Sequence, residues 1–292
     1  MKNKCLLSVG ILMLFALSGW AQIGMQLSSE HDCFLRYEPI HVKLVLRNYS
    51  GNTLLFSADD PSQGKLVFKI SGTGERLIPQ IDPKANPMGG LVFAPGESKE
   101  LNLTLNTLYD LQRDDTYTIT AYVEHKRLPQ AFVSNSVTLE VREGTVLASK
   151  TVGLPTSRDN DPIRSITASL MRFTDGHGEL YCLRIEDAEN VYGTFRVGPY
   201  IHGSKPQLDA DGSSAIHVLV QVRPRLYCYT VYSVIDGEAR QRQRRYYVPE
   251  NGVPQLSRAT GYLKILYARQ ANEGVDFRFQ EENWKPRYSQ PQ

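Results

Sequence analysis

The chain has 292 residues, of which 41% are hydrophobic and 22% charged, a globular composition that excludes a disordered or collagen-like chain. At about 150 residues per domain, this length predicts about two domains, each large enough to bury its own core without a metal or a disulfide. The 33 Lys and Arg residues nearly balance the 31 Asp and Glu residues, which argues against nucleic acid as a partner.

The first 21 residues have the pattern of a cleaved signal peptide. Lys2 and Lys4 precede an apolar run of thirteen residues, Cys5–Leu17, and small residues follow up to Ala21. As a helix this run is only about 20 Å long, whereas a membrane span needs roughly 30 Å. We therefore expect export to the periplasm, the cell surface or the medium, with no transmembrane segment left after cleavage. Trp20 stands where a lipoprotein would have its cysteine, so no lipid anchor is expected.

The mature sequence predicts an all-β protein, because apolar and polar residues alternate and helical periodicity is almost absent. Alternating runs bounded by turn formers lie at Ile40–Arg47, Leu66–Ile70, Leu101–Leu105, Tyr117–Val123 and Val137–Val141. Short strands of this kind over about 120 residues are typical of a β-sandwich. We predict a signal peptide at 1–21, a sandwich at 22–146, a linker at 147–163, a second β domain at 164–279 and a polar tail at 280–292.

The first predicted domain resembles a known module. The segments that carry the resemblance are Tyr37–Ile40, Leu91–Ser98, Leu108–Leu111, Asp115–Thr118 and Ser134–Val137. Together they look like the immunoglobulin-like sandwich that precedes the catalytic domain in secreted zinc metallopeptidases of the deuterolysin type. The resemblance implies the fold of an accessory module and no activity. Those peptidases need a His-Glu-x-x-His motif, and none of the six histidines stands in such a pair.

The second predicted domain contains an internal echo. Glu179–Glu186 and Arg225–Tyr232 align at a spacing of 46 residues. A period in this range is typical of four-stranded propeller blades, but about 130 residues hold at most three blades, too few to close a propeller. We therefore favour a second antiparallel sandwich over blade-like β repeats.

Three cysteines remain in the mature chain, Cys33, Cys182 and Cys228, so at least one stays free. Cys182 and Cys228 occupy matching positions in the echo and are candidates for a disulfide. The alternative is that all three are small buried hydrophobic residues.

Arginine is concentrated in the second half of the chain, where it supplies 15 of the 19 cations from Lys150 onwards. The densest run is Arg240–Arg245, followed by Tyr246. In a strand, alternation would put Arg240, Arg242 and Arg244 on one face. Arginine and tyrosine together bind sulfate, phosphate or carboxylate groups, so these residues are anion-contact candidates. The alternative is an edge strand that uses like charges to prevent aggregation.

Other motifs give weaker signals. Ser62 and Lys65 have the Ser-x-x-Lys spacing of acyl-enzymes but lie in a loop, which predicts a plain turn. Asp209, Asp211 and Ser213 resemble the start of a calcium loop, yet the glutamate that would close it is missing. We therefore predict no metal site and no cofactor.

The functional prediction is an exported, non-enzymatic binding or assembly protein of the cell envelope, with a protein or an anionic polysaccharide as partner. The alternative is an extracytoplasmic hydrolase of glycans or peptides. Its residues would be dispersed over the second domain around Asp175, His177, Asp209, Asp211 and His217.

Overall fold

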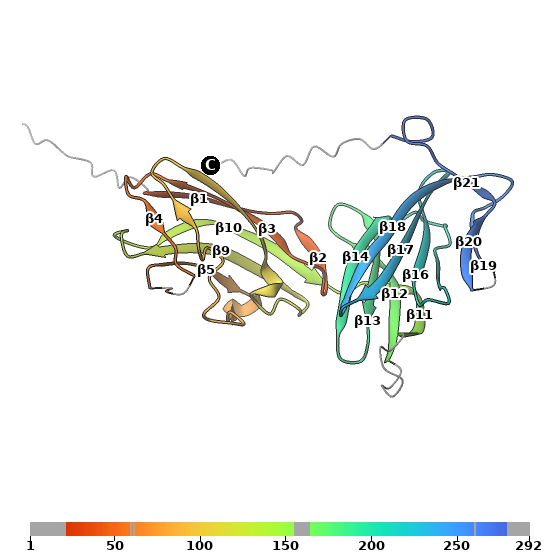
Figure 1. Ribbon diagram of the computed structural model, residues 1–292, viewed down its shortest axis with the longest axis horizontal. Helices are drawn as coiled ribbons and strands as arrows, with labels where there is room; N and C mark the ends of the chain where they lie inside the picture. The colour runs from red at the N-terminus through yellow and green to blue at the C-terminus, as the bar shows by residue number, and fades with distance from the viewer. Residues whose placement is uncertain (1–21, 59, 61, 155–163, 260, 279–292) are drawn as a thin grey trace, which may run out of the picture.

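The computed structural model describes residues 22–58, 60, 62–154, 164–259 and 261–278, and it shows an all-β protein with two sandwich-like halves in tandem (Figure 1). The predicted all-β class is therefore confirmed. Within these ranges the helical structure is limited to two short 3-10 turns, Thr73–Glu75 and Leu105–Thr107. No helix in the described part of the chain is long and apolar enough to span a membrane.

The first half contains strands β1 to β10. They are β1 (Ile23–Ser29), β2 (Cys33–Leu35), β3 (His41–Asn48), β4 (Leu54–Leu55), β5 (Gly64–Ser71), β6 (Leu77–Ile78), β7 (Val92–Phe93), β8 (Ser98–Thr104), β9 (Asp115–His125) and β10 (Phe132–Arg142). One sheet has the order β1-β3-β8, the facing sheet has the order β2-β10-β9-β5-β6, and β4 pairs with β7. Strand β2 runs parallel to β10, whereas the other ladders between these strands are antiparallel.

Alternation explains how the first core forms. In β3, Val42, Leu44 and Leu46 are buried, and the side chains between them are more exposed. In β9 of the opposite sheet, alternate residues from Tyr117 to Val123 are buried in the same cluster. Each such side chain contributes about 1.5–3 kcal/mol when it leaves water, so this pattern fixes which face of each strand points inward.

The second half contains strands β11 to β21. They are β11 (Thr145–Leu154), β12 (Arg164–Thr174), β13 (Glu179–Glu186), β14 (Val191–Pro199), β15 (Gln207–Ala210), β16 (Ile216–Arg223), β17 (Leu226–Ile235), β18 (Glu238–Pro249), β19 (Gln255–Ala259), β20 (Tyr262–Leu266) and β21 (Ala268–Gln270). The sheets have the orders β11-β12-β13-β14 and β15-β16-β17-β18-β21. Side chains from both sheets meet in one core, as in a second sandwich. The hairpin β19–β20 packs on the outer face of the second sheet through Leu256 and Ile265.

The predicted linker 147–163 is wrong over its first part. Residues Thr145–Leu154 form β11, so only Glu143 and Gly144 separate the strands of the two halves. The remainder, 155–163, lies outside the described residues, as does the predicted tail from residue 280. Strand β11 escaped prediction because it is an edge strand with one exposed face, where Ser149, Lys150 and Gly153 interrupt the apolar alternation.

The two halves meet at an apolar joint. Cys33 and Leu35 of β2 pack against Met171, Phe173 and Cys182, which belong to the outer face of the sheet β11–β14. All five side chains are less than 5% exposed. The two halves are therefore joined both by these packed side chains and by the short connection at Gly144 (Figure 1).

One arginine adds a polar centre to this joint. Arg196 of β14 donates from Nε to Glu38 Oε1 at 2.5 Å, from Nη1 to Asp175 Oδ2 at 2.9 Å and from Nη2 to the Cys33 carbonyl at 2.8 Å. Its side chain is 19% exposed, and those of Glu38 and Asp175 are 9% and 12% exposed. Sequence analysis missed this network, because Glu38 and Arg196 are 158 residues apart and nothing local links them.

Candidate anion-binding surface

Strand β18 carries the arginines that the sequence singled out, but they do not share one face. The strand pairs with β17 along most of its length, and the register shifts between Val231 and Tyr232, so that Arg242 has no partner opposite it. Such a bulge adds one residue and reverses the alternation beyond it. Arg244 consequently stands opposite the fully buried Thr230, whereas Arg240 stands opposite Ser233. The predicted common face of Arg240, Arg242 and Arg244 is therefore wrong.

Arg244 and Tyr246 connect the two sheets of the second half. The Arg244 guanidinium donates from Nη2 to the Val197 carbonyl of β14 at 2.7 Å and from Nε to the Tyr246 hydroxyl at 2.9 Å. Its carbon Cζ also lies 5.8 Å from the centre of the Tyr246 ring. Arg244 therefore links β18 to β14 of the other sheet, and the Tyr246 hydroxyl orients its guanidinium.

Arg240, Arg242 and Arg245 are exposed, as is part of Arg244. Arg240 pairs with Glu238 at 3.0 Å, and both side chains are more than half exposed. Arg242 and Arg245 are exposed and form no ion pair with any described residue. The neighbouring strand β17 contains no charged residue over Leu226–Ile235, so nothing beside them in the sheet offsets their charge. We call Arg240, Arg242 and Arg245 the β18 arginine surface.

Aromatic and polar side chains adjoin this surface on the outer face of the sheet. Arg245 stands opposite Tyr229 in the ladder, and Tyr229 contacts the ring of Tyr247 edge-on at 6.0 Å. Burial raises the pKa of the Tyr229 hydroxyl, and the nearby Arg245 charge opposes this shift. Tyr229 is only 7% exposed and packs with Tyr247 beneath the hairpin β19–β20, so the tyrosines support the strand from below and the exposed guanidinium groups are the part of this face that can bind anions.

His217 lies in a buried hydrogen-bonded chain that sequence reasoning missed. Its Nδ1 is 2.7 Å from the Tyr229 hydroxyl, and its Nε2 is 3.2 Å from Asp211 Oδ2. The histidine is only 6% exposed. The pairing of β16 with β17 brings these groups together, and no spacing in the sequence signals it. Both ring nitrogens of His217 have hydrogen-bond partners, so these bonds hold the side chains of Asp211 and Tyr229 in fixed positions on the outer face of the sheet.

The carboxylates of the calcium-loop candidates Asp209 and Asp211 form ion pairs and hydrogen bonds within the protein. Asp209 Oδ1 lies 2.8 Å from Lys150 Nζ and 2.8 Å from Arg258 Nη2. Asp211 Oδ1 accepts from the backbone N–H and the hydroxyl of Ser213, as in an Asx turn. These carboxylates bind protein cations and donors instead of converging, and the described residues contain no group of acidic, His and Cys side chains that suits a metal ion.

The candidate disulfide between Cys182 and Cys228 is not formed in this structure, in which both residues are free thiols. Cys182 belongs to the joint between the halves, whereas Cys228 belongs to the core between the two sheets. The echo therefore aligns two strands whose matching residues point to different faces. Burial raises the pKa of Cys33, Cys182 and Cys228, which disfavours the reactive thiolate and fits the alternative of small hydrophobic residues.

The residues named for a dispersed hydrolase site lie in two separate places. Asp175 is held by Arg196 at the joint, and the exposed His177 lies 3.8 Å from Asp32 of the first half. Asp209, Asp211 and His217 instead belong to the second sheet, where each has the partners given above. No shared cleft brings these two groups together among the described cavities.

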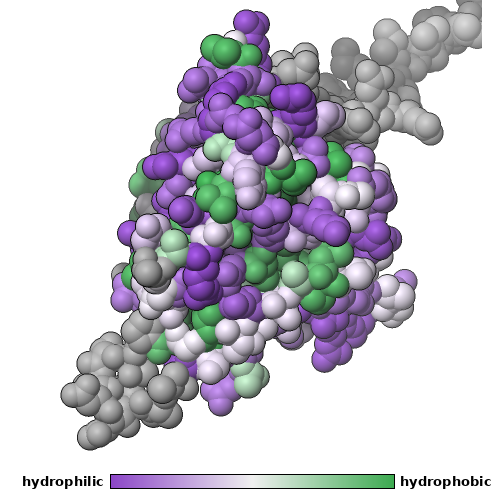
Figure 2. All heavy atoms as spheres, turned by 90° about the vertical axis from the view of Figure 1, so that its right-hand side faces the viewer, coloured by the Kyte–Doolittle hydropathy of each residue, from purple (hydrophilic) through white to green (hydrophobic). Residues whose placement is uncertain are grey.

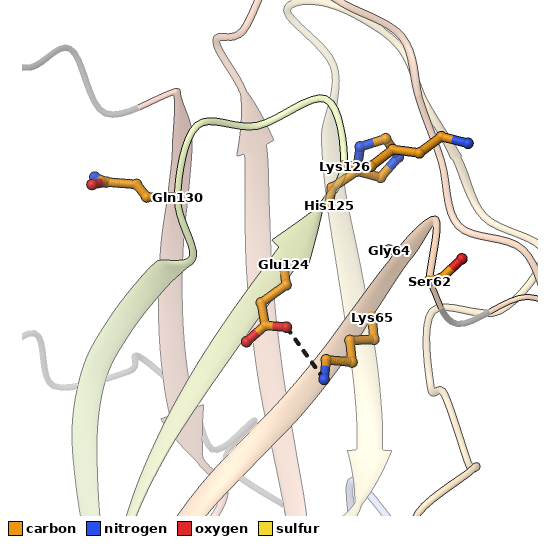
Figure 3. Close-up of a pocket in the computed structure, with 7 residues that line it drawn as sticks. All are labelled: Ser62, Gly64, Lys65, Glu124, His125, Lys126 and Gln130. Carbon is orange, nitrogen blue, oxygen red and sulfur yellow. Dashed lines mark ion pairs between the residues drawn. The ribbon is translucent and has the colours of Figure 1, made fainter.

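A cavity of about 430 Å³ lies at one end of the first half, lined by Ser62, Gly64, Lys65, Glu124, His125, Lys126 and Gln130 (Figure 3). The Ser62 hydroxyl donates to Asp60, and Lys65 Nζ lies 3.2 Å from Glu124 Oε2, so the Ser-x-x-Lys spacing does not pair its two groups. His125 accepts the Arg127 N–H at Nδ1 and contacts the Leu55 carbonyl through Nε2, the bonding of a neutral ring. Burial lowers its pKa as well. This cavity has no activated nucleophile.

No known family profile matches the chain, and no curated protein matches it either.

Proposed function

We propose that the chain is an exported binding protein of the cell envelope and that the β18 arginine surface contacts an acidic partner, either an anionic polysaccharide or an acidic protein surface. The observation that carries this proposal is the uncompensated charge of Arg242 and Arg245 beside the uncharged strand β17. Guanidinium groups form planar, bidentate hydrogen bonds with sulfate, phosphate and carboxylate groups, which makes an acidic macromolecule the fitting ligand.

Binding fits the site better than hydrolysis does. The acids and histidines named for the rival function are engaged in ion pairs, turns and buried chains, and they lie in two separate regions. The β18 arginine surface is instead exposed and charged, as expected for contacts with a large partner. A chain held at a packed joint can also present this surface in a constant orientation relative to its first half.

The first half supports the role of an accessory module. Its sheets β1-β3-β8 and β2-β10-β9-β5-β6 follow an immunoglobulin-like order, in which the first part of the chain pairs with both sheets. The Tyr117 hydroxyl donates to the Arg113 carbonyl at 3.1 Å near the start of β9, where immunoglobulin-like folds have their tyrosine corner. We therefore propose an immunoglobulin-like sandwich for this half.

The proposed surface can be tested on a polyanion column. The double variant Arg242→Gln and Arg245→Gln removes two charges and keeps hydrogen-bonding side chains, so the fold should persist. We expect wild type to be retained on heparin at low salt, and the variant to elute much earlier. The slope of log affinity against log salt should fall by about two, roughly one for each lost contact.

A matched control separates this surface from overall charge. Lys84→Gln with Lys126→Gln also removes two charges, but from exposed positions on the first half. This control should elute close to wild type. An equal loss of retention in both double variants would show that net charge, and not the β18 arginine surface, causes binding to the column.

Export is testable on protein recovered from the producing cells. Because a signal peptidase reads the small residues before its cut, N-terminal sequencing should start at Gln22 or within a few residues of it. Replacing Ala21 by Arg should block cleavage and leave the longer form, as shown by mass spectrometry. Intact Met1 on a cytoplasmic wild-type protein would refute export, and the envelope role with it.

A further inference from the structure

The hairpin β19–β20 is an excursion from the second sheet. Pro249, the last residue of β18, pairs directly with Ala268, the first residue of β21, so residues 250–267 leave the sheet and return to it at one point. The two strands of the hairpin pair with each other and with no other described strand. Because an isolated two-stranded hairpin is at best marginally stable in water, its position depends on contacts with the rest of the second half.

Both ends of this excursion turn sharply at the same place. Asn251 and Tyr267 each have a φ of +59°, in the left-handed region that bulky residues rarely adopt, and Gly252 has a φ of +147°. A hydrogen bond of 2.8 Å from the Glu250 N–H to the Tyr267 carbonyl joins the two ends. The hairpin is therefore attached through one narrow base, where rotation of a few backbone angles changes its direction.

Strand β15 supplies polar contacts that hold the hairpin in place. The Gln207 side chain accepts from the Leu256 N–H at 2.7 Å and donates to the Pro254 carbonyl at 2.9 Å. The Arg258 guanidinium donates from Nη2 to Asp209 Oδ1 at 2.8 Å. These bonds run between side chains and one strand, so breaking them leaves the ladders of the two main sheets intact.

The hairpin covers an apolar, tyrosine-lined area on the outer face of the second sheet. Leu256 and Ile265 pack against a cluster that contains Leu219, Tyr229 and Tyr247. Leu219 is fully buried, although it does not belong to the core between the two sheets. Figure 2 looks onto this side of the molecule, and its hydrophobic side chains form only small groups among hydrophilic ones. The hairpin thus removes the apolar area from the surface.

The area beneath the hairpin is ordered by the sheet itself. The Tyr229 hydroxyl is 2.7 Å from His217 Nδ1, and the Tyr229 ring meets that of Tyr247 edge-on at 6.0 Å. His217 Nε2 is in turn 3.2 Å from Asp211 Oδ2. None of these groups belongs to the hairpin, so moving the hairpin away leaves them in place, as a preformed binding face requires.

We infer that the hairpin β19–β20 is a hinged cover, which opens about its base and admits the sugar rings of an anionic polysaccharide to the tyrosines beneath it. This inference rests on the proposed function, because Arg245 of the β18 arginine surface stands directly opposite Tyr229 in the ladder. When the cover is open, the rings of Tyr229 and Tyr247 lie beside the exposed Arg245 guanidinium. Flat rings that stack and a guanidinium that pairs with sulfate or carboxylate together suit a charged sugar.

Thiol labelling detects the opening without any ligand. Leu219 and Val220 are neighbours on β16 and are both fully buried, but Leu219 lies in the cluster under the hairpin and Val220 in the core between the sheets. A thiol reagent should therefore modify Leu219→Cys at least about tenfold faster than Val220→Cys, after each rate is corrected for global unfolding measured in urea. Equal corrected rates, from mass spectrometry of the labelled peptides, would overturn the cover.

Gln207 offers a way to loosen the hairpin without changing charge. Gln207→Ala removes both hydrogen bonds to the hairpin, so it should speed the labelling of Leu219→Cys about tenfold and leave that of Val220→Cys unchanged. The control is Gln255→Ala, since Gln255 is exposed on the hairpin itself, and it should alter neither rate. If Gln207→Ala accelerates both reporters equally, the hairpin does not open by itself.

A shortened variant tests the polysaccharide. Replacing residues 250–267 by an Asn-Gly turn joins β18 directly to β21 and removes the cover. The removed segment carries one Glu, one Arg and one Lys, so charge alone would weaken retention on heparin. We expect the shortened variant to elute at higher salt than wild type, and equal or weaker retention would overturn the inference.

Two comparisons keep this test decisive. If the shortened variant does not fold, Gln207→Ala should still elute from heparin later than Gln255→Ala, and equal elution of these two would contradict the inference. Failure of the proposed function is a separate result, in which wild type and the Arg242→Gln and Arg245→Gln double variant elute alike. The labelling rates do not depend on those arginines.

Discussion

Replacing Arg196 by Met is expected to lower the free energy of unfolding by about 3–5 kcal/mol, the typical cost of removing one partner from a buried ion pair. Arg196 holds two carboxylates and a backbone carbonyl at the joint between the halves. Without its charge, Glu38 and Asp175 would remain close together and nearly buried with no cation between them. Urea unfolding at neutral pH, followed by circular dichroism, would measure the loss.

Two further variants identify the cause of this loss. Adding Glu38→Gln to Arg196→Met removes one of the stranded charges and should restore part of the stability, because the two residues act on each other. Arg172→Met serves as the control, since Arg172 is 39% exposed and its ion pair with Glu179 is 3.5 Å long. It should cost about 1 kcal/mol or less. If Arg196→Met costs no more than Arg172→Met, the joint does not depend on this charge network.

Replacing Asp209 by Asn is expected to make the protein less stable at neutral pH but not in acid. Burial raises the pKa of Asp209, but Lys150, the Ala210 N–H and Arg258 outweigh it and lower the pKa to about 2. An unfolded aspartate titrates near 3.9, so the folded carboxylate adds stability above about pH 4, and this is lost as pH falls through about 2. The side chain is 26% exposed, and we expect about 1–2 kcal/mol after screening by solvent.

Urea unfolding of wild type and Asp209→Asn at pH 6 and pH 2 would measure this difference. The difference in free energy of unfolding between the two proteins should be close to its full size at pH 6 and should shrink toward zero at pH 2. Glu273→Gln is the control, because Glu273 is exposed and forms no ion pair with a described residue. It should match wild type at both pH values. A gap that is the same at both pH values would show that Asp209 acts through packing or hydrogen bonds alone.

Only part of the candidate surface could be predicted from the sequence. The run from Arg240 to Arg245 is visible in the sequence, and its position on a strand was predicted correctly. The sequence did not predict which of these arginines share a face, because the bulge at Arg242 depends on the pairing of β18 with β17. A single extra residue turned Arg244 toward Val197 and brought Arg245 to the outer face instead.

The cysteines show the same limit. Cys182 and Cys228 stand in segments so similar that a bridge between them was a reasonable hypothesis. Alternation does indicate that neighbouring residues point to opposite faces, but it does not say which face is the core when both are covered. Strand β13 is covered on one side by the second sheet and on the other by the first half, so Cys182 is buried away from Cys228.

The sequence by itself determined the all-β class, because alternation of apolar and polar residues is a local pattern that reports which strands have one face in a core. It also indicated most of the strands and the arginine-rich segment. The tertiary structure alone decided the joint around Arg196 and the buried hydrogen bonds that link Asp211, His217 and Tyr229. Each of these depends on which strands become neighbours, and that choice is made by the packing of residues far apart in the chain.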